Sequence, residues 1–231
     1  DYLVIASGTS NGFWRDDSIR SKKEIDDALQ ADAARIKAAN TIAVLGGGPC
    51  GVSCALNIRR ADPSKQVTLY FSGDQPLAGY HPTAQAYYEK ILKDAGVTLQ
   101  SNDRAIVPSV TPDSGSINFE SGASAEADTI LWTVGKRKPH SQYLPTDLLD
   151  AEGFVKTKST LEVEGTDTLF AIGDVASTDP DRSSARNWAY GILVNNIKRK
   201  AAGKSVNQFY KPPPNRWGSI VGPQADGLTL H

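Results

Sequence analysis

The feature that most constrains this chain is a glycine cluster that directly follows a short apolar segment. The segment Thr41–Leu45 is long enough for a strand buried on both faces. It runs into Gly46-Gly47-Gly48-Pro49-Cys50-Gly51, which has the spacing G-x-G-x-x-G and precedes a stretch suited to a helix. Gly46 permits a tight turn, Gly48 lets the backbone approach a pyrophosphate, and Gly51 allows close helix–sheet packing. The sequence therefore predicts a dinucleotide-binding turn backed by a helix N-terminus, with an unoccupied tight turn as the alternative.

The segments on either side of this turn alternate between strand and helix patterns. Strands are expected at 41–45, 66–71 and 97–99, and helices at 52–60 and 83–95, with Gly96 as the left-handed residue that ends the second helix. This order predicts a parallel sheet with right-handed crossovers, and therefore an α/β fold.

Further elements are expected outside this unit. Ser21 and Glu24 have the spacing of a capping box, which predicts a helix at about 21–39. The remaining expectations are strands at 3–5, 105–110, 116–119, 129–133 and 169–172, a helix at about 184–202, and a stiff proline-rich linker at 211–214.

Composition excludes several classes of function. Lys and Arg number 25 against 26 Asp and Glu, so the formal charge of −1 gives no reason to expect nucleic-acid or general anionic-membrane binding. Two cysteines and three scattered histidines predict neither a disulfide scaffold nor a zinc cluster. No apolar run is long enough to predict a transmembrane segment.

The start of the chain indicates a piece of a larger protein. The sequence contains no methionine and opens on an apolar strand pattern. No signal peptide is visible, so we expect a cytoplasmic or organelle-associated protein whose partners include the remainder of its own chain.

The second strand of the predicted sheet ends without the acidic residue that commonly holds the ribose of NAD. Ser72 occupies the expected position, Asp74 lies two residues later, and no Arg stands beside them in the sequence for a 2′-phosphate. The choice between NADH and NADPH is therefore left open.

Other chemically suggestive residues have simpler interpretations. Cys50 and Cys54 would lie on one helical face, but i,i+4 spacing leaves Cβ atoms about 5–6 Å apart, too far for a disulfide, so small core thiols are favoured over a redox dithiol. Asp174 follows Gly173 at a strand end, where it could meet a ligand hydroxyl or cap a helix. His81 and His140 are expected at the surface, and no catalytic or metal-binding arrangement is identifiable.

Four segments, in this order, resemble those of a known family. Asp1–Gly8 resembles "YDYLVIATG", Thr41–Leu56 resembles "VVVVGGGPVGVELA", Asp128–Gly135 resembles "DLVVWATG", and Thr168–Val175 resembles "NIFAIGDVA". Together they are similar to FAD-dependent pyridine-nucleotide oxidoreductases, nearest to apoptosis-inducing-factor-like and type II NADH dehydrogenase-like flavoproteins. The ordered set is more specific than any single motif.

The resemblance implies a Rossmann-like nicotinamide domain inserted into a partial Rossmann-like FAD domain. Its expected parts are an FAD-domain strand and turn at 1–10, a connecting segment with a helix at 11–39, an NAD(P)-binding domain at 40–137, the second part of the FAD domain at 138–210, and the start of a C-terminal interface domain at 211–231. By resemblance, NAD(P)H would be held by Gly46, Gly47, Gly48, Pro49, Gly51 and Ser72, with Gly135 lining the same cleft, and FAD by Ala6, Gly8, Gly173 and Asp174.

Three departures from the family pattern qualify these expectations. The first glycine motif, which grips the ADP half of FAD, would precede Asp1. The family's Glu after the helix glycine is replaced by Ser53, and nothing substitutes for the redox cysteine pair of the disulfide-reductase branch. The expected function is hydride transfer from NAD(P)H to FAD and then to a quinone-like acceptor, with a nucleotide-binding remnant without flavin as the alternative. The chain alone is expected to bind FAD weakly or not at all.

Overall fold

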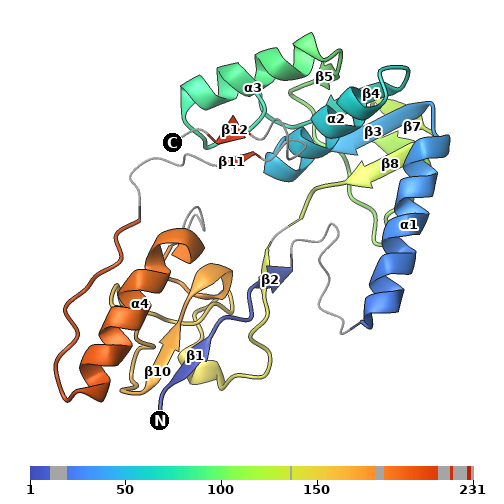
Figure 1. Ribbon diagram of the computed structural model, residues 1–231. Coiled ribbons are helices and arrows are strands. Elements are labelled where there is room, and N and C mark those ends of the chain that lie inside the picture. The colour runs from blue at the N-terminus through green and yellow to red at the C-terminus, as the bar shows by residue number, and fades with distance from the viewer. Residues whose placement is uncertain (11–19, 136, 180–184, 213–218, 221–227, 230–231) are drawn as a thin grey trace. The chain divides into compact units, whose positions relative to one another are not determined.

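The computed structural model describes residues 1–10, 20–135, 137–179, 185–212, 219–220 and 228–229. The chain forms two compact units, one of residues 1–17 with 136–216 and one of residues 18–135 with 217–231. Figure 1 labels most of their helices and strands.

The larger unit is built on a four-stranded parallel sheet. Its strands stand in the order β5 (Thr98–Gln100), β4 (Gln66–Tyr70), β3 (Thr41–Leu45) and β8 (Thr129–Trp132). All three neighbouring pairs are parallel, so the predicted parallel α/β arrangement is confirmed. The chain order reverses direction across the sheet at β3, and such a switch point is where α/β sheets bind ligands, beyond the carboxyl ends of the strands.

Two helices connect the strands of this sheet. Helix α2 (Pro49–Ala61) leads from β3 to β4, and α3 (Pro82–Asp94) leads from β4 to β5. Each helix has a proline in its first turn, where a backbone amide would have no acceptor within the helix. Gly96 follows α3 with φ of +81°, which confirms the predicted left-handed residue.

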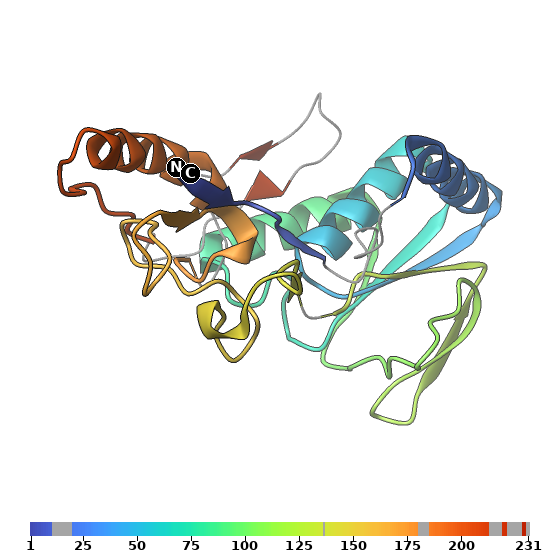
Figure 2. The same ribbon diagram turned by 90° about the horizontal axis from the view of Figure 1, so that it is seen from below.

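A β-hairpin covers the sheet face opposite α2. Strands β6 (Gly115–Asn118) and β7 (Ser124–Ala127) pair antiparallel, and Figure 2 shows them on the other side of the sheet from the helices. Their buried side chains pack with alternate residues of the central strands into one cluster, formed by Ala43, Leu45, Ile117, Phe119, Ala127, Ile130 and Trp132. This double cover explains why β3 and β8 are apolar on both faces.

The strand expected at 105–110 is absent, and this prediction was wrong. The segment makes one isolated bridge, between Ala105 and Phe119, and its apolar side chains at Ile106, Val107 and Val110 are exposed. Pro108 has no amide hydrogen for a strand ladder, and the segment runs over the surface instead. Strand β7 was missed because its small and acidic residues have low β-propensity and pair through β6.

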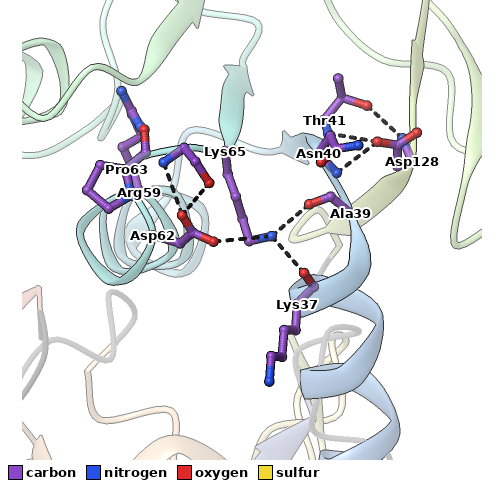
Figure 3. A network of polar contacts seen from close by, with 10 residues as sticks. Lys37, Ala39, Asn40, Thr41, Arg59, Asp62, Pro63, Lys65 and Asp128 are labelled. Carbon is purple, nitrogen blue, oxygen red and sulfur yellow. Dashed lines mark hydrogen bonds and ion pairs between the residues drawn. The ribbon is translucent and has the colours of Figure 1, made fainter.

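Helix α1 (Lys22–Ala38) begins at the predicted capping box, with Ser21 and Glu24 each bonding the other's backbone. None of its residues is buried. Polar contacts at its C-terminal end therefore attach it to the rest of the larger unit. Figure 3 shows Lys65 Nζ donating to the carbonyls of Lys37 and Ala39, at 2.9 and 2.7 Å. Asp128 accepts hydrogen bonds from the next two backbone amides, those of Asn40 and Thr41.

The smaller unit contains two short strand pairs. Strand β1 (Leu3–Ile5) lies parallel to β10 (Leu169–Ala171), and β2 (Thr9–Ser10) lies antiparallel to β9 (Lys138–Pro139). The 3-10 helices η1 (Thr146–Leu148) and η2 (Gly173–Val175) and helix α4 (Ala185–Ala201) complete the unit. One hydrophobic cluster joins Ile5 to Val155 and Ala171, and a second packs α4 through Ala189 and Leu193 against Phe170.

Near the C-terminus, β11 (Ser219–Ile220) and β12 (Leu228–Thr229) pair antiparallel and belong to the larger unit. Parts of the expected segments lie outside the described residues: Pro213 and Pro214 of the linker, most of the interface segment, and residues 11–19 of the connecting segment. Among the residues that are described, no helix is long and apolar enough to cross a membrane.

Candidate functional site

The glycine turn after β3 packs closely against Thr133, Phe71 and its own backbone. Gly46 has φ of +120°, and a Cβ added there would lie 2.7 Å from the Thr133 hydroxyl. A Cβ on Gly47 would meet the Phe71 side chain at 2.7 Å. At Gly51 a Cβ would lie 1.8 Å from the Gly46 carbonyl oxygen, well inside contact distance. The fold itself therefore requires glycine at these three positions.

Gly48 is different, because nothing in the fold requires glycine there. Its φ of −76° and ψ of 179° suit any residue, and a Cβ added to it would have no described atom within 4 Å. Gly48 is also the N-cap of α2 and forms no side-chain cap, although Ser, Asp or Asn would serve that position slightly better. The open space beside it, at the positive end of the helix dipole, suits a phosphate group that comes against the backbone.

A cavity of about 210 Å³ opens at the carboxyl edge of the sheet, beside this turn. Its lining combines the glycine turn, the end of β4 and two residues from farther along the chain. The lining residues are Gly46, Gly47, Gly48, Tyr70, Phe71, Ser72, Gly73, Gln75, Ala78, Arg104 and Val134. Four residues of the predicted site thus lie together on one cavity: the first three glycines of the turn and Ser72.

The loop after β4 is bonded to the glycine turn. The Leu77 amide donates to the Gly47 carbonyl at 2.7 Å, although Leu77 has φ of +60°, an uncommon conformation for a non-glycine residue. The side chain of Leu77 is fully buried. These contacts fix the wall of the cavity that carries Ser72 and Gln75.

Arg104 is the charged residue of the lining that the sequence reasoning missed. It follows β5, which is the neighbour of β4 in the sheet, and so reaches the cavity from 32 positions beyond Ser72. Its Nε lies 3.8 Å from Glu120 Oε1, and both side chains are more than 60% exposed. Asp74 is exposed and does not contribute to the cavity lining.

The other residues predicted for the nicotinamide site lie beside the cavity. Pro49 and Gly51 form the first turn of α2 behind the glycine turn, and neither contributes to the lining. Gly135, which was expected to line the cleft, follows Val134, and Val134 is the residue that lines it. Gly135 has φ of +145°.

The residues predicted for the flavin site lie in the smaller unit. The Ile172 amide donates to the Ile5 carbonyl at 3.0 Å, so the carboxyl ends of β1 and β10 lie side by side. Ala6 and Gly8 therefore follow one strand, and Gly173 and Asp174 follow the other, at the same edge of the pair. Gly8 and Gly173 both have positive φ, and a Cβ on either would have no described atom within 4 Å. This edge leaves room for a ligand at the backbone.

Cys50 and Cys54 do not form a disulfide. Burial, followed by the nearby Cys50, raises the pKa of the Cys54 thiol to about 11, so it is protonated at neutral pH and is a poor nucleophile. Both side chains are partly buried, and the absence of a redox dithiol stays a prediction.

His81 and His140 are the histidines among the described residues, and each contacts a backbone group. His81 caps α3, where its Nδ1 accepts a hydrogen bond from the Thr83 amide. The His140 ring lies with its Nδ1 3.2 Å from the Ser7 carbonyl oxygen. No cluster of metal-binding side chains occurs in the described part of the chain.

Comparisons with known proteins identify the family. The family model "Pyridine nucleotide-disulphide oxidoreductase" matches residues 1–192. The oxidoreductase ptaL of Pestalotiopsis fici is 30% identical, and the match covers 96% of this chain and 60% of that protein. Apoptosis-inducing factor homolog A of Dictyostelium discoideum is 28% identical, with 99% of this chain and 62% of that protein covered.

Solved structures show the same fold. The NAD-dependent persulfide reductase from A. fulgidus matches with a TM-score of 0.66 and 18% identity, over 92% of this chain and 42% of that chain. The chain spans about 60% of the length of the curated relatives named above. On the family match over residues 1–192, this chain belongs to the pyridine nucleotide-disulphide oxidoreductase family, whose membership implies FAD and NAD(P)H as cofactors.

Proposed function

We propose that the protein to which this chain belongs is an FAD-dependent NAD(P)H oxidoreductase, which passes electrons from NAD(P)H through FAD to a small acceptor such as a quinone. The observation that carries the proposal is Gly48. Its glycine is not explained by the fold, and it stands beside an open cavity at the N-terminus of α2. A pyrophosphate that approaches the backbone explains both facts.

The residues of the larger unit would do the binding and the positioning. The turn Gly46–Gly48 and the first turn of α2 would hold the pyrophosphate, and the side chains after β4 would hold the adenosine ribose. When bound, FAD supplies the redox chemistry, because its ring accepts a hydride from the nicotinamide. No acid or base group is required of the protein for this transfer.

The residues of the smaller unit would bind the flavin side of FAD. Ala6, Gly8, Gly173 and Asp174 share one edge of the β1–β10 pair, where backbone groups and one carboxylate are available to a ligand with hydroxyl groups. The quinone-like acceptor rests on resemblance to the family alone.

The substitution Gly48→Asp tests the nicotinamide site. Asp is a good N-cap residue, so the free energy of unfolding should stay within about 0.5 kcal/mol of the wild-type value. Its carboxylate would occupy the space assigned to the pyrophosphate, and repulsion between the two should weaken NAD(P)H binding by about 100-fold or more. Binding is measured by calorimetric titration of the chain with NADH and NADPH.

Ser21→Asp is the matched control, because it places the same side chain at the N-cap of α1, away from the cavity. It should leave NAD(P)H affinity unchanged. If folded Gly48→Asp binds both nucleotides as tightly as the wild type, the proposal is wrong.

A second candidate is a nucleotide-binding chain without flavin. It is favoured by one observation, that the 231 residues contain a single G-x-G-x-x-G turn, and that turn belongs to the nicotinamide cavity. Titration of the chain with FAD separates the two candidates. FAD binding that Asp174→Ala weakens, in this chain or in the longer protein, supports the flavoprotein, whereas binding that is insensitive to Asp174, or absent from the longer protein as well, supports the second candidate.

A further inference from the structure

The end of the cavity beside β4 combines a hydroxyl and a positive charge. Ser72 stands two residues beyond the end of β4, and Arg104 comes from the chain after β5. Neither residue identifies a ligand by itself. Together they line one cavity with the glycine turn, at the position where the adenosine ribose of a bound dinucleotide lies in this fold.

The carboxylates near this end do not line the cavity. Asp103 accepts hydrogen bonds from the Ser121 hydroxyl and amide, at 2.5 and 3.3 Å, so its carboxylate is turned to the β6–β7 hairpin. Asp74 is exposed outside the lining. Among the described residues, no Asp or Glu lines the cavity, so no carboxylate there is available to hold a ribose diol.

The two nicotinamide dinucleotides differ at this point alone. NADPH carries a 2′-phosphate with a charge of about −2 where NADH has a hydroxyl. A carboxylate favours the hydroxyl and repels the phosphate. An arginine offers several N–H donors in a planar fork that fits phosphate oxygens, and a serine hydroxyl can donate one more hydrogen bond.

We propose that Ser72 and Arg104 form a 2′-phosphate site and that the chain therefore prefers NADPH to NADH. The inference rests on the proposed function, because it assigns the preferred substrate of the same cavity. Arg104 is then a specificity-determining residue. It comes from the segment after β5 rather than from the end of β4.

Glu120 modulates this site. Its Oε1 lies 3.8 Å from Arg104 Nε, longer than a hydrogen bond, and both side chains are well exposed. Such a pair contributes little to stability and is readily exchanged for a phosphate. Glu120 nevertheless places a negative charge near the ligand, so Glu120→Gln should strengthen binding of a 2′-phosphate a few-fold.

The experiment compares ligands that differ in the 2′-phosphate alone. Calorimetric titration of the 231-residue chain with NADP⁺ and NAD⁺ is paired with titration by adenosine 2′,5′-bisphosphate and adenosine 5′-monophosphate. In each pair, the ligand with the 2′-phosphate should bind at least about tenfold more tightly than the ligand without it. A tenfold difference in affinity is about 1.4 kcal/mol. The preference should decrease at high salt, because the Arg104 side chain is 65% exposed.

Substitutions separate a specific role from a general effect of charge. Arg104→Ala should remove the preference while NAD⁺ affinity changes less than about twofold, because the turn and the cavity remain intact. Arg60→Ala is the matched control, since Arg60 lies at the C-terminal end of α2, far from the turn at the helix N-terminus. It removes the same charge and should leave the preference unchanged.

Each outcome has a distinct meaning. Equal affinities within each pair, or a preference that survives Arg104→Ala, overturn the 2′-phosphate site and leave the proposed function standing. Failure of both dinucleotides to bind overturns the proposed function, and the inference with it. A preference that is lost in Arg104→Ala, kept in Arg60→Ala and enhanced in Glu120→Gln supports the site.

Discussion

At the scale of single residues, the glycines of the turn divide into those required by the fold and one explained by a ligand. Gly46 and Gly51 are held against Thr133 and against each other, at distances that leave no room for a side chain. Gly48 faces open space in an ordinary backbone conformation. The sequence motif assigns a role to each of these three glycines by analogy with other dinucleotide-binding turns. The distances from an added Cβ to its neighbours distinguish the two fold-required glycines from Gly48.

We expect Gly51→Ala to destabilise the larger unit severely. Its Cβ would lie 1.8 Å from the Gly46 carbonyl oxygen and 2.7 Å from the Thr133 hydroxyl, so the start of α2 must move away from the turn. The expected loss is about 3 kcal/mol or more of unfolding free energy, measured by urea denaturation. Gly48→Ser is the control and should change it by less than about 0.5 kcal/mol. Comparable losses for the two substitutions would contradict the division of roles.

At the scale of elements, the sequence predicted the features of helix ends that depend on a few neighbouring residues. The capping box at Ser21 and Glu24 and the left-handed Gly96 were predicted because each depends on neighbouring residues alone. The segment 105–110 was mispredicted because its apolar residues are exposed. Pairing partners decide such cases, and they are not visible in a single stretch of sequence.

Lys65 illustrates an element-scale contact that sequence reasoning could not find. It is a buried lysine whose Nζ bonds the carbonyls of Lys37 and Ala39 and lies 3.6 Å from Asp62 Oδ2. It thus joins the C-terminal ends of α1 and α2, where a cation also meets the negative ends of the helix dipoles (Figure 3).

Lys65→Met should keep the buried stem and leave those carbonyls without their donor. We expect a loss of about 1–3 kcal/mol of unfolding free energy, measured by urea denaturation. The substitution should increase the amide hydrogen exchange rate more in α1 than in β3. Lys22→Met is the control, because Lys22 is exposed and its ion pair joins it to Asp26 on the surface of α1. It should cost less than about 1 kcal/mol. Equal effects of the two substitutions would show that the Lys65 contacts do not fasten α1.

Asp128 adds a pH dependence at the same place. Hydrogen bonds from the Thr41 and Asn40 amides and the contact with the Thr41 side chain lower the pKa of its carboxyl below the usual value. A lowered folded-state pKa gives stability that is present above the unfolded-state value of about 3.9 and lost as the pH falls through the folded-state value.

Asp128→Asn should therefore lower the urea midpoint at pH 7 and have a smaller effect at pH 3, because pH 3 lies below the unfolded-state pKa of about 3.9 and part of the stability from the ionised carboxyl is lost there. The measurement is the difference in midpoint between the two proteins at each pH. A difference that is as large at pH 3 as at pH 7 would show that the charge of Asp128 makes no contribution.

At the scale of the whole molecule, the sequence predicted the α/β class, the parallel sheet and the glycine turn, because motif, strand and helix are contiguous in the chain. It could not predict that Arg104 joins Ser72 in one cavity, since sheet order brings them together from β5 and β4. For the same reason the choice between NADH and NADPH, left open by the residues around Ser72, becomes a testable question once the sheet is known.

The central claim is that the turn after β3 binds a nicotinamide dinucleotide. The most direct measurement is a titration of the isotopically labelled 231-residue chain with NADP⁺, followed through its backbone amide resonances. The account predicts shifts that saturate together at Gly46, Gly47 and Gly48, at Ser72 and Gly73 after β4, and at Arg104, with α4 unaffected. Resonances of the turn that stay unchanged at millimolar nucleotide, or saturable shifts confined to the smaller unit, would contradict it.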